Sequence, residues 1–305
     1  MLQAVTLKEK MKTDFTNRVS ISKIMVTTDF SEISDRALDY AIALARRYDA
    51  RIYLAHVITP DPFQFAEPQL AQATYEKVRQ AAEEGIADIL ISGKLRGVPH
   101  EVLLEEGNVW PSLDSLIVRN DIDLLVVGTH GRGKVQKLLM GSVAEEIFRE
   151  ADCAVLTVGP AVKSPNVKEV ELNHILFATD FGAGAEKAAA YAFSLAQEQN
   201  ATLTLLHVIE SAAAYTEESV ARQREINVVR MKQLMPAGTE NWCKPDFRAT
   251  FGAAAEEILI AARESKADLI VMGAKARNSL AGHAPLTIAY NVVTKSTCPV
   301  LTVRS

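Results

Sequence analysis

The sequence predicts an α/β protein built from two tandem domains, each with a doubly wound sheet of five parallel strands. Three observations support this prediction: the chain repeats itself, apolar runs of strand length alternate with amphipathic runs of helix length, and several strand-like runs are apolar throughout. Continuous apolar strands are typical of parallel sheets that helices cover on both faces. Strands that alternate with helices favour the doubly wound arrangement.

The internal repeat defines the domain organisation. The segment KIMVTTDFS at 23–31 recurs as HILFATDFG at 174–182, an offset of 151 residues, whereas Gly128 and Gly273 are 145 residues apart. The second copy therefore lacks six residues between its second and third strands. We predict four segments: an N-terminal arm over 1–20, a first domain over 21–160, a linker over 161–170 and a second domain over 171–305.

Each predicted element of the first copy follows from its hydrophobic pattern. The helix predicted over 31–48 places apolar side chains on one face at spacings of three and four, and Ser31 is suited to cap it. A second, longer helical segment lies around 67–96. The members of the helical face are Ile33, Ala37, Tyr40, Ala41 and Leu44. The predicted strands are 23–28, 51–57, 101–105, 124–128 and 154–158.

The predicted topology indicates where a ligand binds. Doubly wound sheets bind ligands beyond the carboxyl ends of their strands, where the strand order reverses. Asp29 follows the first strand and Gly128 ends the fourth. If these strands are neighbours, we expect both residues to face one crevice.

The segment after the fourth strand, VVGTHGRGKVQKLLMGSVAEEI at 126–147, is rich in glycine. Glycine allows close approach of a ligand to the backbone, and successive N–H groups bind anions. Ser142 reads as a helix start with Glu145 at capping-box spacing, and a helix N-terminus also favours phosphate. Arg132 could add positive charge. The segment differs from a P-loop, because Val135 has no hydroxyl for magnesium and the loop does not follow the first strand.

Composition and charge exclude other classes of function. The net charge of -5 and the absence of a basic run interleaved with aromatic residues argue against a nucleic-acid partner. No apolar segment has the length of a signal peptide or a membrane span, so we expect a cytoplasmic protein without a membrane partner. The three cysteines have no metal-ligand spacing, and we expect reduced thiols. No cluster of His, Asp and Glu has convincing metal spacing.

The spacing of Gly128, Gly131, Gly141 and Ser142, Gly-x2-Gly-x9-Gly-Ser, resembles the nucleotide motif of the universal stress protein family. The segments TTDFS, HV and CAVLTV, at the ends of the first and second strands and in the fifth, are also similar to that family. The resemblance covers almost the whole chain twice. It implies Rossmann-like domains of the adenine nucleotide alpha hydrolase-like type, and the motif belongs to the branch of the family that binds ATP.

The resemblance implies a set of binding residues in the first domain and one ligand, ATP, with magnesium arriving on its phosphates. It places Asp29 on the ribose or adenine side, Ile52 against adenine through its backbone, and Thr28 at the same strand end. The glycines and Ser142 would hold ribose and phosphates. The complete set is Thr28, Asp29, Ile52, Gly128, Gly131, Arg132, Gly141 and Ser142.

The second copy departs from the motif. Ala276 replaces the second glycine, and Leu286-Thr287 stands where Gly-Ser is required. Pro285 adds bulk and lacks an N–H donor. We therefore predict one working site, in the first domain.

Three hypotheses of function remain open at this point. The first is a stress-response protein that binds ATP as a sensor or regulator without fast turnover, because no persuasive general base or nucleophile is evident. The second is a slow nucleotide hydrolase or transferase that uses Asp29 or His130. The third is an interaction scaffold. The resemblance further implies that the fifth strands of the two domains pair within the chain as a pseudo-dimer, and we expect two chains to form a homodimer. His56 and His207 are interpreted as hydrogen-bonded structural histidines.

Overall fold

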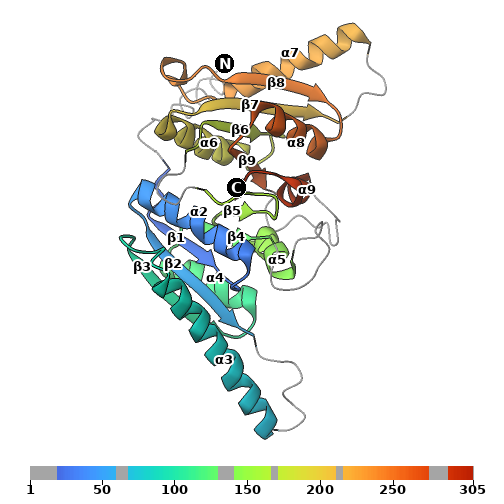
Figure 1. Cartoon of the computed structure of the whole chain (residues 1–305). Helices are drawn as coiled ribbons and strands as arrows, with labels where there is room; N and C mark the ends of the chain where they lie inside the picture. Colours follow the sequence, from blue (N-terminus) through green and yellow to red (C-terminus); the bar gives the residue numbers. More distant parts are fainter. Residues whose placement is uncertain are drawn as a thin grey trace, which may run out of the picture. The chain divides into compact units, whose positions relative to one another are not determined.

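The structure is a computed structural model that describes residues 19–59, 68–129, 141–165, 171–210, 216–274 and 288–304. The chain divides into two compact units, one over Ile21–Val170 and the other taking in Glu171–Ser305 (Figure 1). Each unit is an α/β domain with five parallel strands, which confirms the predicted fold class. No helix within the described ranges is long and apolar enough to cross a membrane.

The first unit alternates strands and helices along the chain. The strands agree with the predicted ones to within one residue at each end. The elements are β1 (Lys23–Thr27), α2 (Glu32–Tyr48), β2 (Arg51–Ile58), α3 (Pro68–Ile91), β3 (His100–Glu106), α4 (Val109–Asn120), β4 (Leu124–Gly128), α5 (Ser142–Glu150) and β5 (Ala154–Val158).

The second unit repeats this order with one short 3₁₀ helix added before its third strand. Its elements are β6 (His174–Ala178), α6 (Ala185–Gln199), β7 (Thr202–Ile209), α7 (Glu217–Gln233), η1 (Thr239–Asn241), β8 (Asp246–Phe251), α8 (Ala254–Ser265), β9 (Leu269–Ala274), α9 (Ile288–Lys295) and β10 (Val300–Arg304).

The strand order creates a switch point in each unit. The first sheet has the order β3-β2-β1-β4-β5 and the second has the order β8-β7-β6-β9-β10, with parallel neighbours throughout. The chain therefore winds outward from β1 in one direction and from β4 in the other. Because such crossovers are right-handed, α2 and α3 cover one face of the first sheet, and α4 and α5 cover the other (Figure 1). The predicted neighbours, β1 and β4, are paired at the switch point.

Helix α2 shows how local sequence positions the switch point. The Ser31 side chain accepts a hydrogen bond from the N–H of Ser34, as expected of a helix cap. The buried face differs slightly from the prediction, because Leu38 and Ile42 are fully buried whereas Tyr40 is half-buried. The cap holds the start of α2 directly behind the end of β1.

The beginning of the predicted linker is bound to the first unit. Arg36 of α2 donates hydrogen bonds to the carbonyl oxygens of Pro160 (3.1 Å) and Val162 (2.8 Å), and the Tyr40 hydroxyl donates to that of Lys163 (3.1 Å). The first residues of the predicted linker are therefore held by donors of α2, and the boundaries of a linker over 161–170 stay a prediction.

Candidate functional site

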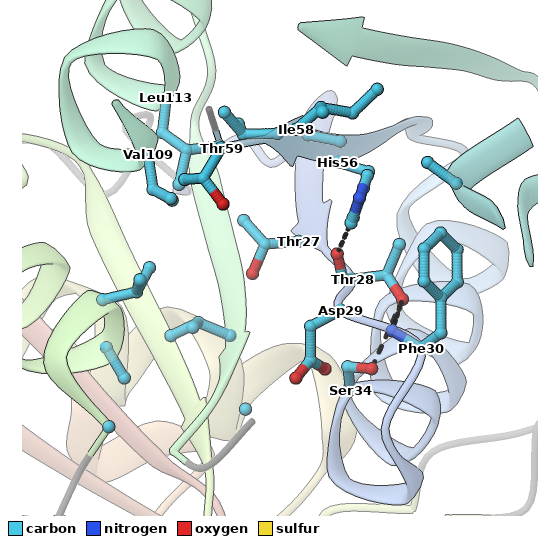
Figure 2. Close-up of a pocket in the computed structure, with 18 of the residues that line it drawn as sticks. Thr27, Thr28, Asp29, Phe30, Ser34, His56, Ile58, Thr59, Val109 and Leu113 are labelled. Atoms are coloured by element: carbon cyan, nitrogen blue, oxygen red, sulfur yellow. Dashed lines mark hydrogen bonds between the residues drawn. The ribbon is translucent and has the colours of Figure 1, made fainter. Parts of the chain in front are cut away.

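A cavity of about 690 Å³ lies at the carboxyl ends of the strands of the first unit (Figure 2). Its lining comes from the ends of β1, β2 and β4, from the starts of α4 and α5, and from one face of α3. Asp29 and Gly128 both line it, which confirms the crevice that the strand order predicts. The volume lies within the range of about 300–1,000 Å³ typical of small-molecule sites.

The structure brings together five of the predicted binding residues, although Gly128 and Gly141 are far apart in the chain. The N–H of Gly141 donates to the carbonyl oxygen of Thr129 at 2.7 Å, and this bond joins the start of α5 to the end of β4. Two further predicted residues, Gly131 and Arg132, lie outside the described residues. The five predicted residues that line the cavity are Thr28, Asp29, Gly128, Gly141 and Ser142.

Ile52 does not reach the cavity, so its predicted contact with a ligand is wrong. It is the second residue of β2, it is fully buried, and its N–H donates to the carbonyl oxygen of Pro99. The nearest residue of β2 that lines the cavity is Ala55, three positions further along the strand, which corresponds to about 10 Å at roughly 3.3 Å per residue. The backbone that β2 presents to the cavity belongs to the segment from Ala55 to Thr59.

The end of β1 divides its polar groups between the two faces of the sheet. The Thr28 hydroxyl accepts the N–H of Phe30 at 3.0 Å and lies 3.3 Å from the Ser34 hydroxyl, so it serves the turn into α2. Figure 2 shows the Asp29 carboxylate and the Thr27 and Thr59 hydroxyls pointing into the cavity. The Thr27 and Thr28 hydroxyls therefore lie on opposite sides, because successive side chains of a strand point to opposite faces, and the Thr27 hydroxyl is the one that points into the cavity.

Asp29 has a structural and a binding role. One of its carboxylate oxygens, Oδ1, accepts the N–H of Ser31 at 3.1 Å, which closes the turn before α2. A carboxylate accepts several hydrogen bonds, so Asp29 also suits the hydroxyl or amino donors of a ligand.

The turn after β1 holds an unusual residue in place. Phe30 has a φ of 62°, in the left-handed region that non-glycine residues rarely adopt. Its ring packs against that of His56, with 4.6 Å between the centroids, and His56 Nδ1 lies 2.7 Å from the Thr28 carbonyl oxygen. His56 is thus the hydrogen-bonded structural histidine that the sequence predicts, and it also lines the cavity.

The second unit has the same turn, so the turn belongs to the fold and not to the cavity. Phe181 has a φ of 57°, its ring lies 4.5 Å from that of His207, and His207 Nδ1 lies 2.9 Å from the Thr179 carbonyl oxygen. Burial lowers the pKa of His207, and Arg230 acts in the same direction, against the opposing effects of the Thr179 carbonyl and Asp180.

Gly128 is required by packing as well as by the cavity. A Cβ at this position would lie 3.0 Å from Ile33 Cγ2 and 3.3 Å from the backbone nitrogen of Ser34. The absence of a side chain lets the first turn of α2 approach the end of β4. The glycine that the motif assigns to ligand contact therefore also sets the distance between α2 and the sheet.

The start of α5 offers backbone donors to the cavity. Gly141 occupies the cap position and α5 begins at Ser142, so the predicted capping box between Ser142 and Glu145 is wrong: the cap residue has no side chain to accept a bond. The described residues provide no acceptor for the N–H groups of Ser142, Val143 and Ala144. Free N–H groups and the positive end of the helix dipole favour a phosphate at this place.

The sequence did not indicate the apolar walls of the cavity. Val109 and Leu113 of α4 and Val78 and Ala82 of α3 line it, although no motif marks them. They come from helices whose inward faces depend on how they pack. The end of β2 could have been found from the strand-end rule, since the HV segment that resembles the family lies there.

A resident metal ion is not indicated in the part of the chain that the structure describes. It contains no group of three or more His, Cys, Asp or Glu side chains that could hold one. Asp29 is the carboxylate that lines the cavity among the described residues.

Comparison with known proteins gives relatives that match about half of the chain and others that match nearly the whole chain. A universal stress protein of Thermus aquaticus is 32% identical over 136 residues, which span 44% of this chain and 96% of that protein. A solved universal stress protein from Archaeoglobus fulgidus has a TM-score of 0.68 at 18% identity and covers 92% of this chain and 98% of its own, so the fold is shared.

Two solved relatives contain nucleotides. A universal stress protein in complex with cAMP and one from Archaeoglobus fulgidus in complex with dAMP each cover 44% of this chain and 98% and 99% of their own, with identities of 20% and 16% and TM-scores of 0.37 and 0.34. These complexes describe those proteins. The model of the universal stress protein family matches residues 20–159 and residues 171–304, and the chain therefore belongs to the universal stress protein family.

Proposed function

We propose that the first unit binds ATP or a closely related adenine nucleotide and that the protein acts in the stress response as a nucleotide-dependent sensor or regulator. One observation carries the proposal: a single cavity joins the Asp29 carboxylate to the first N–H groups of α5, for which the described residues provide no acceptor. The phosphates would lie at α5, where the helix dipole and N–H groups favour anions. Ribose or base donors would lie at Asp29. Family members bind adenine nucleotides, as the complexes with cAMP and dAMP show.

The walls support a nucleotide rather than a free anion. Val109 and Leu113 give the cavity an apolar side beside its polar strand ends, as small-molecule sites require. Magnesium would be held by the nucleotide phosphates, and Thr27 and Ser142 of the lining carry hydroxyl oxygens that could assist.

We infer no fast turnover. The His56 ring nitrogen Nδ1 is engaged at the Thr28 carbonyl, and Asp29 holds the turn through Oδ1. Both groups already make hydrogen bonds that hold the turn between β1 and α2. This engagement disfavours either one as a general base. Steady phosphate release by the purified protein that disappears in Asp29→Asn while ATP binding persists would instead establish the hydrolase.

Sedimentation with and without ATP tests the expected homodimer.

The nucleotide proposal has a direct test with a matched control. Nucleotide released from denatured protein is identified, and ATP binding is then measured by titration calorimetry; we expect about one ATP per chain. Asp29→Ala should weaken binding at least tenfold, because it removes the carboxylate from the cavity. Asp180→Ala removes the same turn interaction in the second unit, where Oδ1 accepts the N–H of Gly182 at 2.7 Å, and should leave binding unchanged. Folded protein that binds no ATP with magnesium present would refute the proposal.

A further inference from the structure

The cavity of the first unit extends across the edge of the sheet. Helices α3 and α5 cover opposite faces, because α3 connects β2 to β3 and α5 connects β4 to β5, on either side of the switch point. Both helices line the cavity. A ligand with phosphates at α5 therefore leaves a second part of the cavity, on the α3 side, to be filled.

One stripe of α3 forms the wall of this second part. Its lining residues are spaced by three and four, so they share a face of the helix. The wall is close to the turn after β1: a Cβ at Gly85 would lie 2.7 Å from the Phe30 ring. Packing of α3 on Phe30 thus places the stripe at the edge of the sheet. The stripe consists of Thr74, Lys77, Val78, Ala81 and Ala82.

The equivalent helix of the second unit carries larger side chains on this wall. Aligned by their buried residues, Ala82 and Ile86 of α3 and Asn227 and Met231 of α7, the two helices are offset by 145 residues. Arg230 of α7 therefore replaces Gly85, and its guanidinium lies 3.9 Å from the centre of the Phe181 ring. Asn227, which is 4% exposed, replaces Ala82 and donates to the Gln223 carbonyl oxygen at 2.9 Å. The α7 wall thus carries large polar side chains where the α3 wall carries glycine and alanine.

Lys77 gives the open wall a positive charge. Among the described residues Lys77 makes no hydrogen bond or ion pair, yet it lines a cavity whose carboxylate is that of Asp29. The cavity therefore has two places that favour an anion, the start of α5 on one face and Lys77 on the other, with an acceptor between them. A ligand with one anionic group can occupy only one of these places.

We propose that Lys77 is a specificity-determining residue and that the ligand carries two separate anionic groups: an adenine nucleotide with a second phosphate on its ribose. The 5′-phosphate lies at the start of α5, the second phosphate at Lys77, and Asp29 accepts donors of the ribose or base between them. This inference rests on the proposed function, since it assumes a nucleotide at α5. An ammonium group and a helix N-terminus both bind phosphate well. Each of the two places in the cavity that favour an anion therefore suits a phosphate.

The experiment compares AMP with adenosine 3′,5′-bisphosphate and adenosine 2′,5′-bisphosphate by titration calorimetry on the full chain. We expect at least one bisphosphate to bind about tenfold more tightly than AMP at low salt, since an exposed ion pair of this kind is partly screened by water and salt. Lys77→Met should reduce the ratio of bisphosphate affinity to AMP affinity to near one. Arg222→Met removes a charge at the equivalent position of α7 and should leave the ratio unchanged. Ala81→Ile introduces the residue that α7 has at the equivalent position, Ile226. It should also reduce the affinity ratio, because the larger side chain narrows the cavity beside α3.

The outcomes separate the two proposals. If no nucleotide binds, the proposed function fails. If AMP and ATP bind but neither bisphosphate is preferred, or if the preference survives in Lys77→Met, this inference is overturned while the proposed function stands. Lys77 and Ala81 are both exposed, so neither substitution should impair folding, and the wild-type ratio tests the inference without any variant.

Discussion

The contact between Gly85 and Phe30 allows a prediction in which one substitution has opposite effects in two backgrounds. A Cβ at Gly85 would meet three atoms of the Phe30 ring at 2.7, 2.7 and 2.9 Å. Ordinary contacts of this kind begin near 3.4 Å, so α3 or the ring must move by about 0.7 Å. Overpacking of this degree typically costs about 1–3 kcal/mol. Gly85 lies inside a helix, where alanine is more favourable than glycine by about 1 kcal/mol.

The two effects combine differently in each background. In the wild type, Gly85→Ala should lower the free energy of unfolding of the first unit by about 0–2 kcal/mol, because overpacking outweighs the helical preference. In a Phe30→Ala background the ring is absent, and the same substitution should raise the free energy of unfolding by about 1 kcal/mol. The coupling energy between the two positions is therefore about 1–3 kcal/mol.

The assay uses the buried Trp110 of α4, which reports on the first unit. Urea unfolding is followed by its fluorescence in a Trp242→Phe background, so that the second unit contributes no tryptophan signal. The reasoning is refuted if Gly85→Ala stabilises the protein with Phe30 intact, or if its effect is the same with and without the ring. The first result would mean that the helix moves freely, and the second that the ring is not the limiting neighbour.

Three further predictions concern local stability. Ser31→Ala removes the acceptor for the Ser34 N–H at the start of α2 and should lower the free energy of unfolding by about 1 kcal/mol in urea titrations. Phe177→Ala empties a fully buried position in the second sheet and should cost about 3–5 kcal/mol, seen as a large drop in the melting temperature of that unit. Because the folded pKa of His207 is lowered, the unfolded chain takes up a proton that the folded unit resists, so stability should fall as the pH drops below about 6.5. His207→Gln should flatten this dependence, and an unchanged pH dependence in this variant would contradict the reasoning.

Much of the architecture follows from local patterns. The alternation of strands and helices and the repeat of TTDF as ATDF predict two copies of one fold, and β4 and β5 begin and end at the predicted residues. The Ser31 cap was predictable because its hydroxyl acts within one turn of the chain. These features depend on neighbours in sequence, which a pattern of residue types records directly.

Features that depend on the face of an element were predicted less well. Thr28 and Thr27 are both threonines at the end of β1, and only the pairing of the sheet shows which hydroxyl enters the cavity. Ile52 was placed at the wrong end of β2, although the rule that ligands bind at the carboxyl ends of strands favours the HV segment at the other end. The cap of α5 lies one residue earlier than predicted, at Gly141, whose N–H donates to the carbonyl oxygen of Thr129 directly after β4.

The sequence by itself determined the two domains, their parallel sheets, and the pairing of Asp29 with Gly128 at one crevice. The tertiary structure decided how large that crevice is and which further groups enter it. Helix α3 contributes Lys77 to the first cavity because Gly85 lets the helix rest on Phe30, whereas Arg230 occupies the same place in the second unit. A residue type shows what chemistry a side chain can perform, but contacts between distant segments determine where it performs it, and those contacts exist only in the folded chain.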